Sequence, residues 1–226
     1  MGENMSEKFH KELRELKENL MKMANLSKEM LHKSVKALKE QDVELAEWVL
    51  SNKSHVAEWD AKIEEDAFLL ITLHQPMAKD MRTLACALKM ITYLARIGRY
   101  GKDIAAIVKE LADKPHIAKL VSIPQMEQMV CSMIDDALKA YEEWDIKYIE
   151  NFKERDDEVD ALRYSIFREC LTYMMEDQKN ITRCINYIII ARYLERCADH
   201  ACKMAEKIHY MITGEHIDID DKIPSK

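Results

Sequence analysis

The chain carries one pattern twice along its 226 residues, and this internal repeat constrains the fold more than any other feature. A shift of 103 positions aligns Asp42 with Asp145, Val56 with Val159, Ile63 with Ile166 and Gln75 with Gln178. After a short deletion the shift becomes 100, and Tyr93-Leu94-x-Arg96 aligns with Tyr193-Leu194-x-Arg196. A repeat of this length indicates that two halves of the chain share one structural plan.

Both halves have the apolar spacing of amphipathic helices, in which apolar residues recur three or four positions apart. The first such series is Phe9, Leu13, Leu16, Leu20, Met23 and Met30, with Ser27 and Ser34 on the same seam. Only 4 Gly and 4 Pro are present against 33% charged residues, so few positions can form tight turns. Six helices are predicted, over about residues 9–40, 43–74, 77–112, 125–141, 146–175 and 178–213. We expect Asp42 to cap the second helix and Gly214 to end the sixth.

The connection between the second and third helices of each half is very short, so these two helices must lie antiparallel. The first helix then covers the apolar stripe that remains. The predicted fold is all-α, with two tandem three-helix bundles related by the internal repeat. Asp113, Lys114 and Pro115 interrupt the helical pattern and divide the chain into residues 1–114 and 115–226, the second ending in a polar tail. One continuous elongated bundle is the alternative, which the sequence leaves open.

Charge and composition exclude several classes of function. The net charge of −7 argues against a nucleic-acid partner, because such surfaces carry an excess of Lys and Arg. No uncharged stretch approaches the roughly 20 residues that span a bilayer, so we expect a cytoplasmic chain without direct membrane insertion. The cysteines lack the CxxC spacing of zinc sites and are expected to be reduced core residues. They are Cys86, Cys131, Cys170, Cys184, Cys197 and Cys202.

Two pairs of acidic residues stand out in the second half. Asp156 and Asp160 are four residues apart, as are Glu195 and Asp199, so each pair shares one face of its helix. Antiparallel helices could bring the pairs together, and converging carboxylates need protons or cations to offset their repulsion. Oxygen ligands suit hard ions such as Mg²⁺, Mn²⁺, Ca²⁺ or ferric iron. With 41 Asp and Glu in the chain, a plain solvated face is the alternative.

Three segments of the chain carry longer motifs. Residues 193–206 contain Tyr-Leu-Glu-Arg-Cys-Ala-Asp, which resembles the signature of the PhoU family, in which Leu-Glu-Arg is followed by an Asp four residues after the Glu. Residues 155–169, Arg-Asp-Asp-Glu-Val-Asp-Ala-Leu-Arg-Tyr-Ser-Ile-Phe-Arg-Glu, resemble the companion helix, and residues 75–82 resemble the turn of the first half. The resemblance extends from Phe9 to Gly214.

The resemblance implies a function and a ligand set. In the PhoU family, paired acidic motifs bind multinuclear metal clusters on the bundle surface, and the protein restrains a high-affinity phosphate transporter and signals to a sensor kinase. By resemblance, the metal ligands here are Asp156, Asp160, Glu195 and Asp199. The ion is left open among iron, manganese, magnesium, calcium and zinc.

The first half departs from this motif at every ligand position that aligns. The residues at the four positions are Lys53, Ala57, Ala95 and Arg99. Two cations and two methyl groups cannot hold a divalent ion, so the metal is expected in the C-terminal half only. Lys53 and Arg99 could instead form an anion- or partner-binding patch, with a solvated face as the alternative. Arg96 and Arg196 are expected to form structural ion pairs.

No nucleophile with an orienting base and no Gly-rich phosphate loop is present, so neither catalysis nor tight phosphate binding is expected. The resemblance implies a non-enzymatic regulator of phosphate uptake that acts through a metal-binding helical surface. Its expected partners are the ATPase subunit of a phosphate ABC transporter, which would hold the chain peripherally at the membrane, and a sensor histidine kinase. Association between copies of the chain is left open.

The first alternative is a ferritin-like di-iron oxidoreductase or iron-storage bundle, and the second is a metal-free helical adaptor. A di-iron bundle needs Glu-x-x-His pairs that face one another inside a four-helix core. Two such pairs occur, Glu29 with His32 and Glu206 with His209, but at positions that the repeat does not match. Chance spacing is therefore the preferred interpretation of both pairs.

Overall fold

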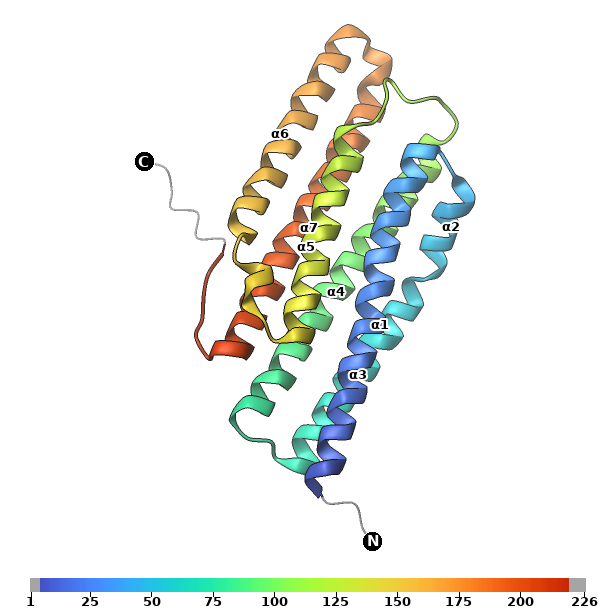
Figure 1. Cartoon of the computed structure of the whole chain (residues 1–226). Helices are drawn as coiled ribbons and strands as arrows, with labels where there is room; N and C mark the ends of the chain where they lie inside the picture. The colour runs from blue at the N-terminus through green and yellow to red at the C-terminus, as the bar shows by residue number, and fades with distance from the viewer. Residues whose placement is uncertain (1–4, 220–226) are drawn as a thin grey trace.

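A computed structural model describes residues 5–219, which are almost entirely helical (Figure 1). The long helices are α1 (Met5–Glu40), α2 (Val43–Ser51), α3 (Lys53–His74), α4 (Ala78–Leu111), α5 (Ser122–Glu143), α6 (Phe152–Glu176) and α7 (Ile181–Thr213). Short 3₁₀ helices, η1 (Ile146–Ile149) and η2 (Gln178–Asn180), precede α6 and α7. These residues contain no β-strand, which confirms the all-α prediction.

The predicted second helix is divided in two at Asn52, so the prediction of one continuous helix over residues 43–74 is wrong at this position. The Asn52 side-chain amide donates a hydrogen bond to the carbonyl oxygen of Trp48 at 2.8 Å. Side chains of this type compete with the helical backbone for hydrogen bonds, which favours a break. The α2 and α3 segments still act together as the second helix of the first half.

The two halves have matching helix caps as well as matching buried positions. Asp42 accepts a hydrogen bond from the backbone N–H of Leu45 at 2.9 Å, and Asp145 accepts one from the N–H of Lys147 at 3.0 Å. The repeat-related apolar residues Val56, Val159, Ile63 and Ile166 are all buried. Gly214 ends α7 with a left-handed φ of 82°, as predicted. The repeat is therefore a repeat of local structure as well as of sequence.

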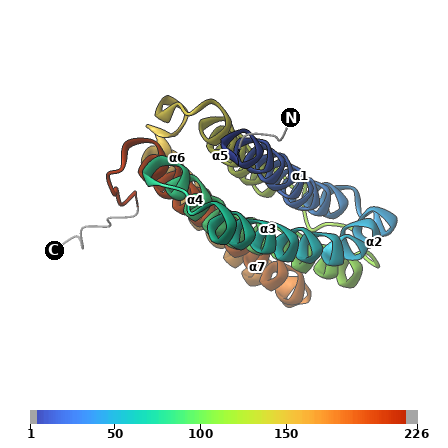
Figure 2. The same ribbon diagram turned by 90° about the horizontal axis from the view of Figure 1, so that it is seen from below.

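The two three-helix halves share one continuous hydrophobic core. Helix α1 packs on α4, α4 on α7, α7 on α5, and α5 on α1, so these four helices form the centre of the molecule. Helix α3 flanks α1 and α4, whereas α6 flanks α5 and α7 (Figure 2). The tandem three-helix plan and the elongated bundle that the sequence left as an alternative are thus both present.

The predicted boundary at residues 114 and 115 falls within the connection 112–121 between α4 and α5. Helix α5 begins at Ser122, three residues before the predicted start, because Pro124 lies in the first turn, where a missing N–H costs no helical hydrogen bond. Residues 1–4 and 220–226, including most of the predicted polar tail, lie outside the described residues.

The six cysteines are free, and five of them are buried, in agreement with the sequence prediction. Burial raises the pKa of the Cys86 and Cys170 thiols to about 12. Within residues 5–219, no helix has both the length and the apolar character needed to cross a membrane.

Helices α1 and α4 touch through their backbones at Gly101. A Cβ atom placed on Gly101 would lie 2.9 Å from the backbone nitrogen of Leu31 and 2.9 Å from the carbonyl carbon of Met30. At Gly98, one turn earlier, the nearest atom is the hydroxyl oxygen of Ser27, at 3.3 Å. The contact at Gly101 is with backbone, which cannot rotate away, so only glycine allows this approach.

We expect Gly101→Ala to lower the free energy of unfolding by roughly 1–3 kcal/mol, because the two helices must separate to admit the methyl group. This loss should exceed the gain of up to about 1 kcal/mol that alanine brings to a helix. Urea unfolding followed by circular dichroism would measure it. Gly98→Ala is the matched control, since it meets a side chain and should have a smaller effect. A Gly101→Ala chain more stable than the wild type would contradict the backbone contact.

Candidate functional site

The four predicted ligands lie on the α6–α7 hairpin, two on each helix. Asp156 and Glu195 are buried, with exposed fractions of 2% and 6%, while Asp160 and Asp199 are half-buried. The apolar neighbours Val159 and Leu194 are fully buried in the core. Helical periodicity therefore sets the acids at the edge of the core, beside the packed interface of α6 and α7.

Three arginines, two of which the sequence analysis missed, neutralise the acids of α7. The Arg163 Nε lies 3.3 Å from an oxygen of Glu195, and Arg192 forms an ion pair with the same oxygen. Arg196 donates to Asp199 at 3.1 Å. The i,i+3 spacing of Arg192 with Glu195 could have revealed one of these pairs. Arg163 comes from α6, and no local spacing relates it to Glu195.

The acids of α7 also line an open hollow of about 550 Å³ on the α4–α7 side of the hairpin. Its lining residues are Tyr93, Arg96, Arg192, Glu195, Arg196, Asp199, His200 and Lys203. The predicted structural ion pair is present for Arg196. The prediction is wrong for Arg96, since no carboxylate of the described residues lies within ion-pair distance of it.

His200 sits at the inner side of this hollow, with an exposed fraction of 8%. Its ring stacks between Tyr93 and Tyr100, with centroid distances of 5.7 and 6.0 Å. Burial, and then the positive charges of Arg96 and Arg196, lower the pKa of His200 to about 4, so the imidazole is neutral at pH 7. Its Nε2 atom is buried and has no hydrogen-bond partner among the described residues.

Comparison with known proteins places the chain in a family. A model of the PhoU domain matches residues 20–108 and again residues 123–208. A phosphate-specific transport system accessory protein PhoU homolog from Aquifex aeolicus is 36% identical over 92% of this chain and 94% of its own length. The homolog of the same name from Rhizobium meliloti is 35% identical over 91% of this chain and 87% of its own length. The chain belongs to the PhoU family.

Solved PhoU structures have the same fold. The crystal structure of PhoU from Pseudomonas aeruginosa superimposes with a TM-score of 0.87 at 29% identity, covering 92% of this chain and all of the other. The phosphate transport system regulatory protein PhoU from Streptococcus pneumoniae gives 0.83 at 26% identity, covering 93% of this chain and 99% of the other. The two matches to the PhoU domain coincide with the two repeats that the sequence indicates.

In this PhoU-family chain, the side chains as arranged do not form a metal-ligand set. Within residues 5–219, no three His, Cys, Asp or Glu side chains are grouped so that they could hold a metal ion. Guanidinium groups pair with one carboxylate oxygen of Glu195 and one of Asp199. A metal at the predicted quartet would have to displace these arginines, and the role of the four acids as ligands stays a prediction.

In the first half, basic residues and alanines occupy the four positions that align with the predicted ligands. Lys53 is the first residue of α3 and is exposed, as is Ala57 one turn later. On α4, Ala95 is half-buried and Arg99 is exposed, with its guanidinium 5.6 Å from the ring centroid of Tyr100. The anion- or partner-binding patch suggested for Lys53 and Arg99 stays a prediction.

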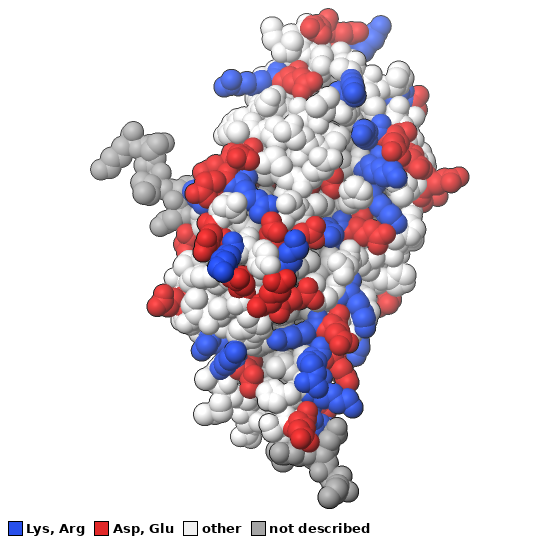
Figure 3. Space-filling model, in the orientation of Figure 1, with Lys and Arg blue, Asp and Glu red and all other residues white. Residues whose placement is uncertain are grey.

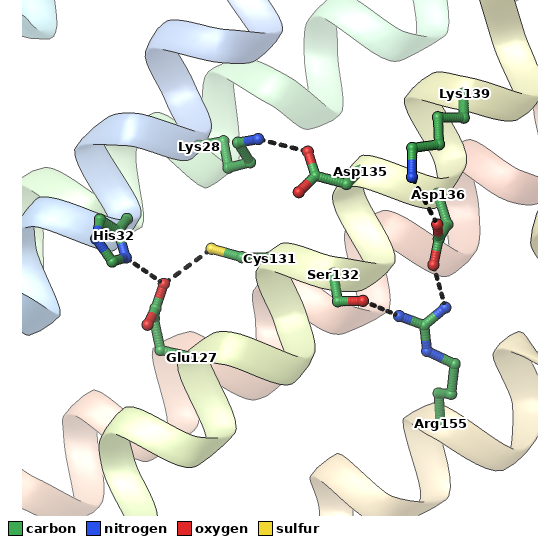
Figure 4. Close-up of polar contacts among 9 residues, drawn as sticks. All are labelled: Lys28, His32, Glu127, Cys131, Ser132, Asp135, Asp136, Lys139 and Arg155. Atoms are coloured by element: carbon green, nitrogen blue, oxygen red, sulfur yellow. Dashed lines mark hydrogen bonds and ion pairs between the residues drawn. The ribbon is translucent and has the colours of Figure 1, made fainter.

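Polar contacts hold α5 against α1, and so join the two halves (Figure 4). His32 on α1 and Cys131 on α5 share one carboxylate oxygen of the buried Glu127, each at 3.0 Å. One turn away, Lys28 pairs with Asp135. The His32 and Lys28 contacts cross between the two helices and favour one register, while the Cys131 thiol, from the same helix as Glu127, helps to satisfy the buried carboxylate.

A second contact holds α6, which carries two of the acids, against α5. Arg155 donates to Asp136 at 2.8 Å and to the hydroxyl of Ser132 at 2.9 Å (Figure 4). Arg155 directly precedes Asp156 in the sequence. The same turn of α6 is therefore anchored to α5 and positions the first predicted ligand.

The side chains of the two Glu-x-x-His pairs, which the ferritin-like alternative would need as metal ligands, contact other residues. His32 contacts Glu127, whereas Glu29 pairs with Lys33 at 2.7 Å. His209 contacts the carbonyl oxygen of Glu215, and Glu206 pairs with Lys203. These contacts give the di-iron alternative no support.

We expect Glu195→Ala to lower the free energy of unfolding by roughly 1–3 kcal/mol, because it leaves Arg163 and Arg192 without a counter-charge next to the core. Asp199→Ala is the matched control, since its pair with Arg196 is more exposed and should contribute about 1 kcal/mol or less. Denaturant unfolding in EDTA measures both without any contribution from metal. Equal losses for the two variants would contradict the assigned pairing.

Proposed function

We propose that this chain restrains phosphate uptake by docking, without catalysis, on the ATPase subunit of a phosphate transporter or on a phosphate-sensing histidine kinase. The supporting observation is the match of both repeats to the PhoU domain, in a chain whose relatives are named accessory proteins of phosphate-specific transport. Such docking would hold the chain at the cytoplasmic face of the membrane through its partner.

The surface offers apolar side chains suited to a protein partner at the two ends of the molecule. The α3–α4 end exposes Phe68, Leu69, Leu73 and Met77, and the α6–α7 end exposes Phe167, Leu171, Met175 and Ile181. These ends lie at opposite extremes of the elongated bundle (Figure 1). Between them, acidic and basic side chains are interspersed over the face shown in Figure 3. Exposed apolar groups beside a charged surface are typical of protein-binding sites.

Deleting the gene should raise phosphate uptake when phosphate is plentiful, because the proposed restraint is lost. Radiolabelled phosphate uptake measures this, and the wild-type gene should restore low uptake. Leu73→Glu and Met175→Glu should restore it less well, since each puts a charge into a proposed apolar contact. Ser165→Glu, which adds the same charge at an exposed polar position of α6, is the matched control. Unchanged uptake in the deletion strain would contradict a role in phosphate transport.

We further propose that a metal ion binds at Asp156, Asp160, Glu195 and Asp199 when it displaces the arginines. The supporting observation is that two acidic pairs are retained on adjoining helices of this half, while the first half carries cations and alanines at the matching positions. When bound, the ion would offset the mutual repulsion of the four carboxylates. In its absence, Arg163, Arg192 and Arg196 supply that positive charge.

Elemental analysis and metal titration of the purified chain should show metal binding that Glu195→Ala weakens by about ten- to a hundredfold, through loss of one ligand. Arg192→Gln should strengthen it, because a competitor is removed. Lys53→Ala and Arg99→Ala are controls and should leave it unchanged. Binding should also raise the thermal midpoint, since the ion prefers the folded state. A chain without metal after growth in iron, manganese and magnesium would contradict this proposal.

A further inference from the structure

We propose that the hollow between α4 and α7 binds a phosphate-class oxyanion between Arg96 and Arg196. This inference goes beyond the proposed function, since neither docking on a partner nor metal binding requires it. Three independent observations on the described residues carry it: an excess of positive charge, the pairing of repeat-related residues across the hollow, and a buried polar atom without a partner.

The charges in the hollow do not balance. Of the residues that line the hollow, Glu195 carries one negative charge and pairs with Arg192. Asp199 is neutralised by Arg196, and Arg96 has no carboxylate partner among the described residues. Lys203, which also lines the hollow, pairs with Glu206 and adds nothing to the excess. The hollow is therefore a local region of positive charge in a chain whose net charge is −7.

The repeat explains why the arginines meet. A shift of 100 positions relates Tyr93 to Tyr193 and Tyr100 to His200, and the rings of these four residues pair across α4 and α7. Tyr93 stacks on His200 at 5.7 Å, and the exchanged pair, Tyr193 with Tyr100, stacks at 5.3 Å. Exchanging the two halves thus reproduces the contact. The same exchange relates Arg96 to Arg196, and both line the one hollow.

His200 adds a polar group that lacks a partner. His200 lines the hollow, and its Nε2 atom is buried without a hydrogen-bond partner among the described residues. Leaving a polar atom in this state is unfavourable, and such groups are normally satisfied by a ligand or by ordered water. An anion held by the arginines, or a water that the anion orders, would complete this hydrogen bond.

Phosphate chemistry fits these groups better than a simple monovalent ion does. Guanidinium groups present paired N–H donors that match two oxygens of a phosphoryl group. The hollow, at about 550 Å³, can take free phosphate or the phosphate groups of a nucleotide. No helix N-terminus or Gly-rich loop contributes, which is why the sequence did not predict a phosphate cradle.

The test is calorimetric titration of the full-length chain with inorganic phosphate and, separately, with ATP, in EDTA and at constant ionic strength. We expect saturable binding with one site per chain. Arg96→Gln should weaken it about tenfold, the change produced by loss of one charged hydrogen-bonding group. Arg168→Gln, an exposed arginine of α6 away from the hollow, is the matched control and should not change it. Tighter binding of ATP than of phosphate would identify the source as a nucleotide, and the reverse would identify free phosphate.

Glu195→Gln separates this site from the proposed metal site. It removes a negative charge from the hollow and should strengthen phosphate binding, whereas it should weaken metal binding.

Circular dichroism of the Arg96→Gln variant verifies folding, and the exposed position of Arg96 makes a folding defect unexpected. The proposal is overturned by absence of saturation below about 10 mM, by equal binding to Arg96→Gln, or by binding that requires a divalent metal. Unchanged phosphate uptake in the deletion strain would contradict the proposed function but not the proposed oxyanion site.

Discussion

The backbone contact between α1 and α4 at Gly101 is the constraint on which the rest of the structure depends. Helix α4 belongs to the first three-helix half and also forms the main interface with α7 of the second. Its position against α1 therefore decides where α7 lies and which side chains face the hollow. A wider separation, imposed by a single methyl group, would act on both halves, because close-packed interiors transmit displacement instead of absorbing it.

At the edge of the second bundle, arginine side chains and the proposed metal ion would compete for the same carboxylates. Glu195 is nearly buried beside the core and cannot remain ionised there at low cost without a positive partner. Arg163 and Arg192 provide that charge, and the proposed metal ion would provide it in another form. Arg192 and Glu195 also line the hollow between α4 and α7. Residues of α7 therefore take part both in the predicted metal site and in the hollow.

The PhoU family assignment and the shape of the molecule support a common picture of a docking protein. The centre is made of α1, α4, α5 and α7, and polar contacts such as those of Glu127 and Arg155 favour one helix register. The apolar ends lie far from this centre, and the charged hollow lies beside it. The proposed docking needs surfaces held in a fixed relation to one another, and a continuous core provides that relation.

The local elements of this fold were predictable from the sequence because they depend on short-range chemistry. Asp42 and Gly214 act as helix caps, and Pro115 lies in the interruption between α4 and α5, because backbone geometry limits what these residue types can do. The seam from Phe9 to Met30 is buried because helical periodicity alone brings these residues to one face. The break at Asn52 escaped prediction, since it depends on one side-chain hydrogen bond to Trp48.

The sequence by itself determined the long helices, the repeat and the family, because each depends on residues within a few turns of one another or on similarity along the chain. Only the tertiary structure decided that the two halves share one core and that Arg163 reaches Glu195 from another helix. It also decided that Arg96 and Arg196, a hundred residues apart, line one hollow beside the unpartnered His200. These relations follow from how α4 crosses α7, and that crossing is set by side-chain packing over the whole interface, which no local pattern encodes.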